Sequence, residues 1–290
     1  MRQCLALRTL VRAWAQYRED RAITLGASLV GAECAAERNA FLALLAHALP
    51  DRSGPLAQAL TLVRRIAIRP LADEAAQSAA IVAASLPDLD AVRAALAVGS
   101  LPRAPLERLL ALVERFRYSA GISGDALAAT AQTPCWAINL AAVARPETLA
   151  LGAIPLPCPG IVQRRLFRAD RTSNERRTIA RENLLAALHD ATCDIAHGPR
   201  AAEAFVRAFP AQRSHSRLYP ACLLLFALDA LSPAGLARAL PSTKAGAAKL
   251  LRQLESGGLA RSQGPWAPFA CAIRLPLTFP AWREEADIHA

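Results

Sequence analysis

Three cations near the carboxyl end of the chain have a spacing that suits contact with phosphate groups. Lys244 and Lys249 are the only lysines in the protein, and Arg252 follows shortly after them. Residues four apart lie on one face of a helix, so Lys244, Ala248 and Arg252 would share an outer surface. Small residues on that face, such as Ala245 and Ala248, would let the helix backbone approach a nucleic-acid duplex closely. The pattern therefore predicts a phosphate-binding helix.

Two hydroxyl residues precede this helix. Either Ser242 or Thr243 can cap the free backbone amides at its start. Because those amides favour an anion, Ser242, Thr243 and Lys244 are candidate phosphate contacts, and Arg252 is the candidate for a base or phosphate contact. The alternative interpretation is that these charges form the solvated outer face of an ordinary amphipathic helix.

The surrounding residues predict a helix-turn-helix. Ser232 followed by Pro233 is typical of a helix start, and Pro241 stops that helix because proline cannot continue the hydrogen-bond ladder. A second helix then runs to the glycine pair at 257–258, which accepts a left-handed cap. Upstream, residues 219–231 predict an apolar helix. Downstream, residues 259–261 and 269–275 predict two strands joined by a turn rich in Gly and Pro.

Three helices followed by a hairpin resemble the winged helix-turn-helix superfamily of bacterial DNA-binding regulators. The resemblance covers about a fifth of the chain and implies that the second helix of the motif enters the major groove of DNA. It also implies a supporting contact from the wing, for which Arg261 is the candidate. Winged helices serve as protein-protein modules as well, so an interaction scaffold remains an alternative function.

A second basic cluster follows a proline-rich stretch that ends near residue 160. Its capping-box pattern, Thr172 to Glu175, predicts a helix from there to about residue 196, with another at 201–209. A second phosphate-contacting surface and a solvated helix face are the two interpretations of this cluster. The residues of this secondary basic patch are Arg164, Arg165, Arg168, Arg177 and Arg181.

Residues that suit metal or catalytic chemistry are sparse. His189, Cys193 and His197 are spaced four apart, but a structural zinc site needs a fourth ligand and a recognisable loop spacing. The dipeptide His189-Asp190 is found in metal-dependent phosphohydrolases, whose other ligand motifs the chain lacks. No phosphate-binding or dinucleotide-binding glycine motif and no nucleophile elbow occurs. We therefore expect no enzyme activity, no cofactor and no metal, with a metal-dependent hydrolase as the remotest alternative.

Composition favours a helical protein with an anionic partner. Hydrophobic residues make up 53% of the chain but aromatic residues only 5%, so the core must be largely Ala, Leu and Val. The formal charge of +10, from 34 basic and 24 acidic residues, suits nucleic acid, although biased codon usage could also enrich arginine. Seven cysteines without a C-x-x-C pair indicate a reducing compartment. With no apolar run long enough to span a membrane, we expect a cytoplasmic protein.

The remaining chain predicts an antiparallel bundle or an array of short helices. The expected helices span residues 4–17, 23–49 (one long helix or a bent pair), 56–68, 73–85, 89–98 and 105–118, with shorter ones at 126–131 and 138–144. The fold class is therefore all-α, an N-terminal helical bundle or array with a C-terminal winged helix-turn-helix-like domain. We divide the chain into a helical domain (1–160), a basic helical connector (161–213), the winged helix-turn-helix-like domain (214–277) and a tail (278–290).

This order of segments resembles uncharacterised bacterial alanine-rich helical families that end in such a unit, a resemblance that implies no particular activity. We expect a protein that binds double-stranded DNA, with transcriptional regulation as its role. The N-terminal part would then serve dimerisation, partner binding or ligand sensing, and a homodimer is compatible with this interpretation.

Overall fold

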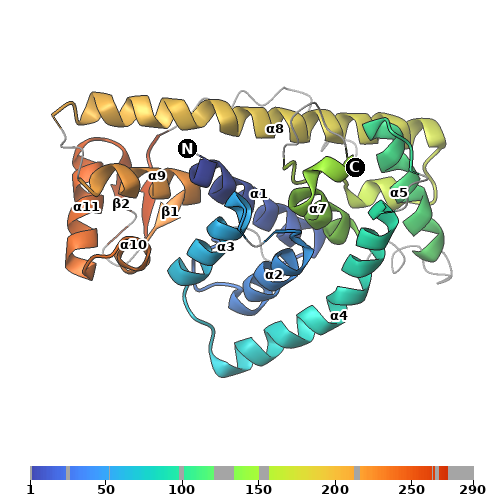
Figure 1. The fold of residues 1–290 in the computed structure, drawn as a ribbon, viewed down its shortest axis with the longest axis horizontal. Helices are drawn as coiled ribbons and strands as arrows, with labels where there is room; N and C mark the ends of the chain where they lie inside the picture. The colour runs from blue at the N-terminus through green and yellow to red at the C-terminus, as the bar shows by residue number, and fades with distance from the viewer. Residues whose placement is uncertain are drawn as a thin grey trace.

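The computed structural model describes residues 2–23, 27–51, 53–97, 101–120, 134–149, 157–211, 216–262, 264 and 268–273. These residues are mostly helical, with three short strands near the carboxyl end. Figure 1 shows helices of the N-terminal body gathered around α1, while α8 runs along one side of the molecule. The helices of the body are α1 (Arg2–Asp20), α2 (Ala35–Ala48), α3 (Pro55–Ile66), α4 (Ala72–Ala97), α5 (Pro105–Ala120) and α7 (Cys135–Ala144).

Helix α1 forms the centre of the core. Its apolar stripe recurs every three to four residues, as an amphipathic helix requires, and includes the buried Leu10, Trp14 and Tyr17. The rings of Trp14 and Tyr17 lie 5.5 and 5.3 Å from the ring of Phe41 on α2, within the range of favourable aromatic packing. In a chain with so few aromatic residues, this cluster joins the first two helices.

In the long helix or bent pair predicted at residues 23–49, the described residues before Ala35 are not helical. Helix α2 begins only at Ala35, because the preceding backbone carbonyls bind buried side chains instead of helical amides. The indole of Trp14 donates to the carbonyl oxygen of Ala27 over 2.9 Å, and Arg38 donates to that of Gly31. Satisfying these two buried donors outweighs continuing the helix.

Two predicted helix breaks do not occur. The 73–85 and 89–98 predictions merge into α4, which contains Pro87, and α8 (Ser173–Ala208) continues through Pro199. A proline in a helix interior frees the carbonyl four residues earlier. Both prolines are exposed, as are the residues four positions before them, so water can bind the freed carbonyls. The predicted capping box at Thr172 and Glu175 is present at the start of α8.

The chain between α7 and α8 contains two short 3-10 helices, η1 (Pro146–Leu149) and η2 (Arg164–Phe167). The predicted helix at 126–131 lies outside the described residues. The stretch before η2 packs in the body, since the amide of Asn139 on α7 donates to the carbonyl oxygen of Val162 over 2.9 Å and accepts from its N–H. None of the described helices has the length and apolarity that crossing a membrane demands.

The carboxyl-terminal unit follows in the order α9 (Leu218–Leu228), β1 (Ala230–Leu231), α10 (Pro233–Ala239), α11 (Lys244–Ser256), β2 (Ala260–Ser262) and β3 (Phe269–Cys271). The strands form an antiparallel sheet in the order β1-β3-β2, with Leu231 opposite Phe269 and Arg261 opposite Ala270. The predicted helix at residues 219–231 is wrong at its carboxyl end, since residues 230–231 form β1. That helix instead ends where Asp229 adopts a left-handed conformation, and the carbonyl of Asp229 accepts from the N–H of Cys271 over 2.8 Å.

Candidate nucleic-acid interface

Helix α11 begins at a side-chain cap. The hydroxyl of Thr243 accepts from the backbone N–H of Gly246 over 3.0 Å, which sets Lys244 as the first helical residue. Of the two predicted caps, Thr243 is therefore the one used. The hydroxyl oxygen of Ser242 is buried and has no hydrogen-bond partner among the described residues. Thr243 and Lys244 are exposed, and Ser242 is half-buried.

The two faces of α11 differ as an amphipathic helix requires. Its inner face buries Leu251 and Leu254 completely, while Lys249 and Arg252 are exposed on the outer face. Figure 1 shows α11 at one end of the molecule, where it contacts α9, α10 and β2 of its own unit. The predicted recognition helix thus keeps its cations in solvent and does not bury them against the N-terminal body.

The cations of this face also lack ion pairs within the described part of the chain. Among the residues that the structure describes, Lys244, Lys249, Arg252 and Arg261 form no ion pair. Arg261 is exposed on β2, in the hairpin that follows α11. An uncompensated positive charge on an exposed face attracts polyanions, and no intramolecular partner needs to be displaced first.

The turn between α10 and α11 is held by arginines from two other elements. The guanidinium of Arg217 donates to the carbonyl oxygen of Pro241, and that of Arg65 on α3 donates to Ala239 over 3.1 Å. In return, Arg238 on α10 donates to the carbonyl of Ile66. These bonds satisfy carbonyls that the end of a short helix leaves free, and they set the direction of α11 relative to the body.

A close contact also joins the ends of α8 and α11. A Cβ atom added to Gly257 would lie 2.5 Å from the ring of Phe209, so a larger residue here would require the ring to shift. Phe209 is the residue that follows α8. The end of α11 therefore packs directly on the end of the longest helix.

The secondary basic patch is differently placed. Its members lie on η2, just after η2 and at the start of α8, and Figure 1 shows the start of α8 and α11 at opposite ends of the molecule. A helix of 36 residues, the length of α8, spans about 54 Å at 1.5 Å per residue. The two predicted basic surfaces are therefore separate and cannot form one continuous site.

Most of this patch is bound to other protein groups. Arg168 pairs with Asp170 at 2.9 Å, and Arg177 pairs with Glu107 on α5. Arg164 donates to the backbone carbonyl of Asp20, and Arg165 donates to the side-chain oxygen of Asn183. Arg181 is exposed, and no ion pair or hydrogen bond of its side chain occurs in the described part of the chain. Four of the five arginines are thus engaged, unlike the cations of α11.

The histidines and cysteine of α8 do not converge. His189 Nε2 lies 3.4 Å from Cys193 Sγ, but His197 is buried, and burial together with the charge of Arg8 lowers the pKa of His197. Asp190 pairs with Arg12 over 3.0 Å. Within the described ranges, no three His, Cys, Asp or Glu side chains are grouped so that they could hold a metal ion.

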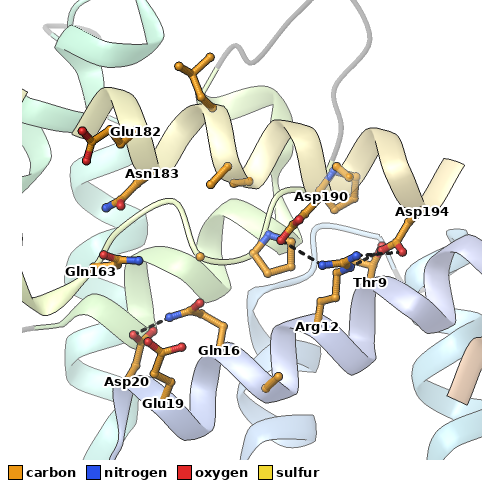
Figure 2. Close-up of a pocket in the computed structure, with 18 of the residues that line it drawn as sticks. Thr9, Arg12, Gln16, Glu19, Asp20, Gln163, Glu182, Asn183, Asp190 and Asp194 are labelled. Carbon is orange, nitrogen blue, oxygen red and sulfur yellow. Dashed lines mark hydrogen bonds and ion pairs between the residues drawn. The ribbon is translucent and has the colours of Figure 1, made fainter. Parts of the chain in front are cut away.

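Sequence reasoning missed an ion-pair network and the cavity beside it. Arg8 and Arg12 lie four apart on α1, and Asp190 and Asp194 lie four apart on α8, so each pair occupies one helix face. Arg8 and Arg12 both bind Asp194, as Figure 2 shows for Arg12. Matching spacings of opposite charges on two helices were the signal in the sequence.

Comparison of the chain with models of protein families, with curated proteins and with solved structures finds no match.

Proposed function

We propose that this protein binds double-stranded DNA through α11 of a winged helix-turn-helix, and that it acts as a transcriptional regulator. The observation that carries the proposal is the set of exposed cations Lys244, Lys249 and Arg252 on the outer face of the second helix of the motif, which form no ion pair with any residue that the structure describes. Phosphate oxygens bind such cations, and a helix of this width fits the major groove.

The order of the elements supports the same proposal. A helix, a short strand, two helices and a hairpin, with the first strand paired to the last, form the arrangement expected of a winged helix. Arg261 on β2 then stands in the wing, where it would contact the backbone beside the groove. The start of α11, capped by Thr243, presents amides that suit a phosphate.

The partner groups of the secondary patch argue against an equal role for it. Arg168 and Arg177 would have to exchange a carboxylate for a phosphate, which gains little energy. Arg181 is the member that could contribute to DNA binding without such an exchange.

A homodimer would present two copies of α11 to two half-sites about one helical turn apart, and we include it in the proposal.

Binding of a fluorescent duplex, followed by anisotropy from about 0.05 to 0.2 M salt, tests the proposal. The variant Lys244→Ala/Lys249→Ala/Arg252→Ala should bind at least about tenfold more weakly. It should also lower the slope of log affinity against log salt by about 2.7, which is 0.9 for each of three phosphates.

The matched control is Arg69→Ala/Arg103→Ala/Arg200→Ala, which removes the same charge from three exposed arginines outside the carboxyl-terminal unit. Its slope should stay near that of the wild type. Equal losses in both triple variants would mean that net charge alone attracts DNA. No loss in the first variant would favour the interaction scaffold.

A further inference from the structure

A cavity of about 910 Å³ lies between α1 and α8, with residues 157–165 forming one wall. Figure 2 shows polar side chains at both ends of this space. At one end, the charged groups of Arg12, Asp190 and Asp194 already form ion pairs with one another. The other end holds polar groups whose hydrogen-bonding capacity the protein itself leaves unused. A volume of this size is in the range of small-molecule sites.

Asn183 is the first of these groups. The residue is only 3% exposed, and its side-chain oxygen accepts from Arg165 over 3.2 Å. Its side-chain nitrogen is buried and has no hydrogen-bond partner in the described part of the chain. Figure 2 shows the amide pointing from α8 toward Gln163, across the cavity. A buried amide that donates to nothing is unfavourable, so an acceptor from a ligand would satisfy it.

The neighbouring Arg165 strengthens this demand for an acceptor. Its Nε atom is likewise buried and has no hydrogen-bond partner among the described residues, while its terminal nitrogen lies 3.9 Å from Glu182. Two such donors therefore belong to side chains that are hydrogen-bonded to each other. A carboxylate is the acceptor that best matches an arginine and an amide together, because its two oxygens can each accept one bond.

Acidic side chains from α1 line the same end of the cavity. Arg164 donates to the backbone of Asp20 on α1, while the next residue, Arg165, donates to Asn183 on α8. The 3-10 helix η2 therefore connects the α1 wall and the α8 wall at this end of the cavity. Glu19 is exposed into the cavity mouth and forms no ion pair among the described residues. A cationic group of a ligand would find a carboxylate here within the same end of the cavity.

The charge of the lining is opposite to that of the whole protein. Five acidic residues and three arginines line the cavity, which leaves two excess negative charges, although the chain carries a net charge of +10. The lining also contains apolar residues, among them Pro157, Pro159 and Ala191, and Ile195 is 44% exposed. An occupant should therefore combine an amine, a carboxylate and an apolar body.

We propose that this cavity binds a small zwitterion with an apolar side chain, namely a free amino acid or a dipeptide. Its carboxylate accepts from Asn183 Nδ2 and Arg165 Nε, its ammonium group lies against Glu19, and its side chain covers the nearby apolar lining, such as Ala187. The proposal is independent of DNA binding, because all of these residues lie away from α11.

Calorimetric titration of the full chain with L-phenylalanine and with L-leucyl-L-leucine tests the proposal and distinguishes the two sources. At least one probe should bind saturably at concentrations up to about 10 mM. Binding weaker than this would not count as specific recognition. The C-terminal amide and the N-acetyl derivative of that probe should each bind at least about tenfold more weakly, since each lacks one charge. Absence of binding by both probes, or equal binding by either derivative, would overturn the proposal.

Two variants test the residues. Asn183→Leu should abolish binding, whereas Asn174→Leu, the same change at an exposed site of α8, should leave it unchanged. Because Asn183 is buried, its variant is first compared with the wild type in thermal unfolding. Glu19→Gln, at an exposed position that folding tolerates, should weaken binding about tenfold, and Glu203→Gln serves as its control. Unchanged affinity in Glu19→Gln would contradict the proposed orientation of the ammonium group.

Discussion

The guanidinium of Arg8 on α1 donates from Nε to Oδ1 of Asp194 on α8 over 2.8 Å, and the side chain of Asp194 is only 4% exposed. Arg12 binds the same carboxylate, and Arg8 also donates to the carbonyl of Phe226 on α9 over 2.9 Å. One buried carboxylate therefore links the central helix, the longest helix and the first helix of the carboxyl-terminal unit. Burial lowers the pKa of Arg8, but the charges of Asp194 and Asp229 together raise it above its usual value.

Replacing Asp194 by asparagine should destabilise the protein strongly. The variant leaves two partly buried guanidinium groups without their shared carboxylate, a change that costs about 3 kcal/mol or more. Urea unfolding followed by circular dichroism measures this free energy. The control Asp170→Asn breaks the exposed pair with Arg168 and should change stability by less than about 1 kcal/mol. Equal stabilities of the two variants would mean that the network does not hold the helices together.

Thr243→Ala and Ser242→Ala should have different effects although they are neighbours. Thr243 caps α11, so its loss should cost about 1 kcal/mol of the free energy of unfolding. The Ser242 hydroxyl is buried and has no hydrogen-bond partner in the ranges that the structure describes, so its removal should be neutral or stabilising. Chemical denaturation of both variants measures the difference. If Ser242→Ala proved the more destabilising, Ser242 would have to be the functional cap.

Asp20 should make stability depend on pH. Burial, opposed only in part by hydrogen bonds from Asn139 and Gln16, raises the pKa of Asp20 from 3.8 to about 6. Between these values the folded protein keeps the proton while the unfolded chain has released it. The contribution of Asp20 to stability therefore falls as the pH rises from about 4 to 6, by about 3 kcal/mol, and is constant above that range.

Denaturation of wild type and of Asp20→Asn at a series of pH values checks this expectation. The difference between the two curves isolates Asp20 from Asp88 and Asp229, whose pKa values burial also raises. The difference in the free energy of unfolding between wild type and Asp20→Asn should change by about 2 to 3 kcal/mol between about pH 4 and 6. The wild type should gain stability relative to the variant as the pH falls. A flat difference would show that Asp20 ionises at its ordinary pKa.

Several features of the fold were predictable because neighbouring residues alone determine them. The capping box at Thr172, the helix start at Ser232 and the stop at Pro241 depend on bonds within a few residues, and all three are present. The outward direction of Lys249 and Arg252 likewise follows from the helical period and from the leucines on the opposite face.

Other features depended on partners distant in the sequence. Helix α8 continues through Pro199 because the site is exposed to water, and α2 starts late because Trp14 and Arg38 take the carbonyls before it. The ion pairing of the arginines also depends on distant partners. Arg177, for example, contacts Glu107 only because α5 and α8 pack together.

The amino-acid sequence by itself thus determined where most helices begin and end and which face of α11 points outward, because these depend on local hydrogen bonds and periodicity. Only the tertiary structure decided which charges are paired, and where α1 and α8 leave a cavity lined by Asn183, whose amide nitrogen has no partner among the described residues. Pairing and cavities arise from side chains that are far apart along the chain, so no local pattern specifies them.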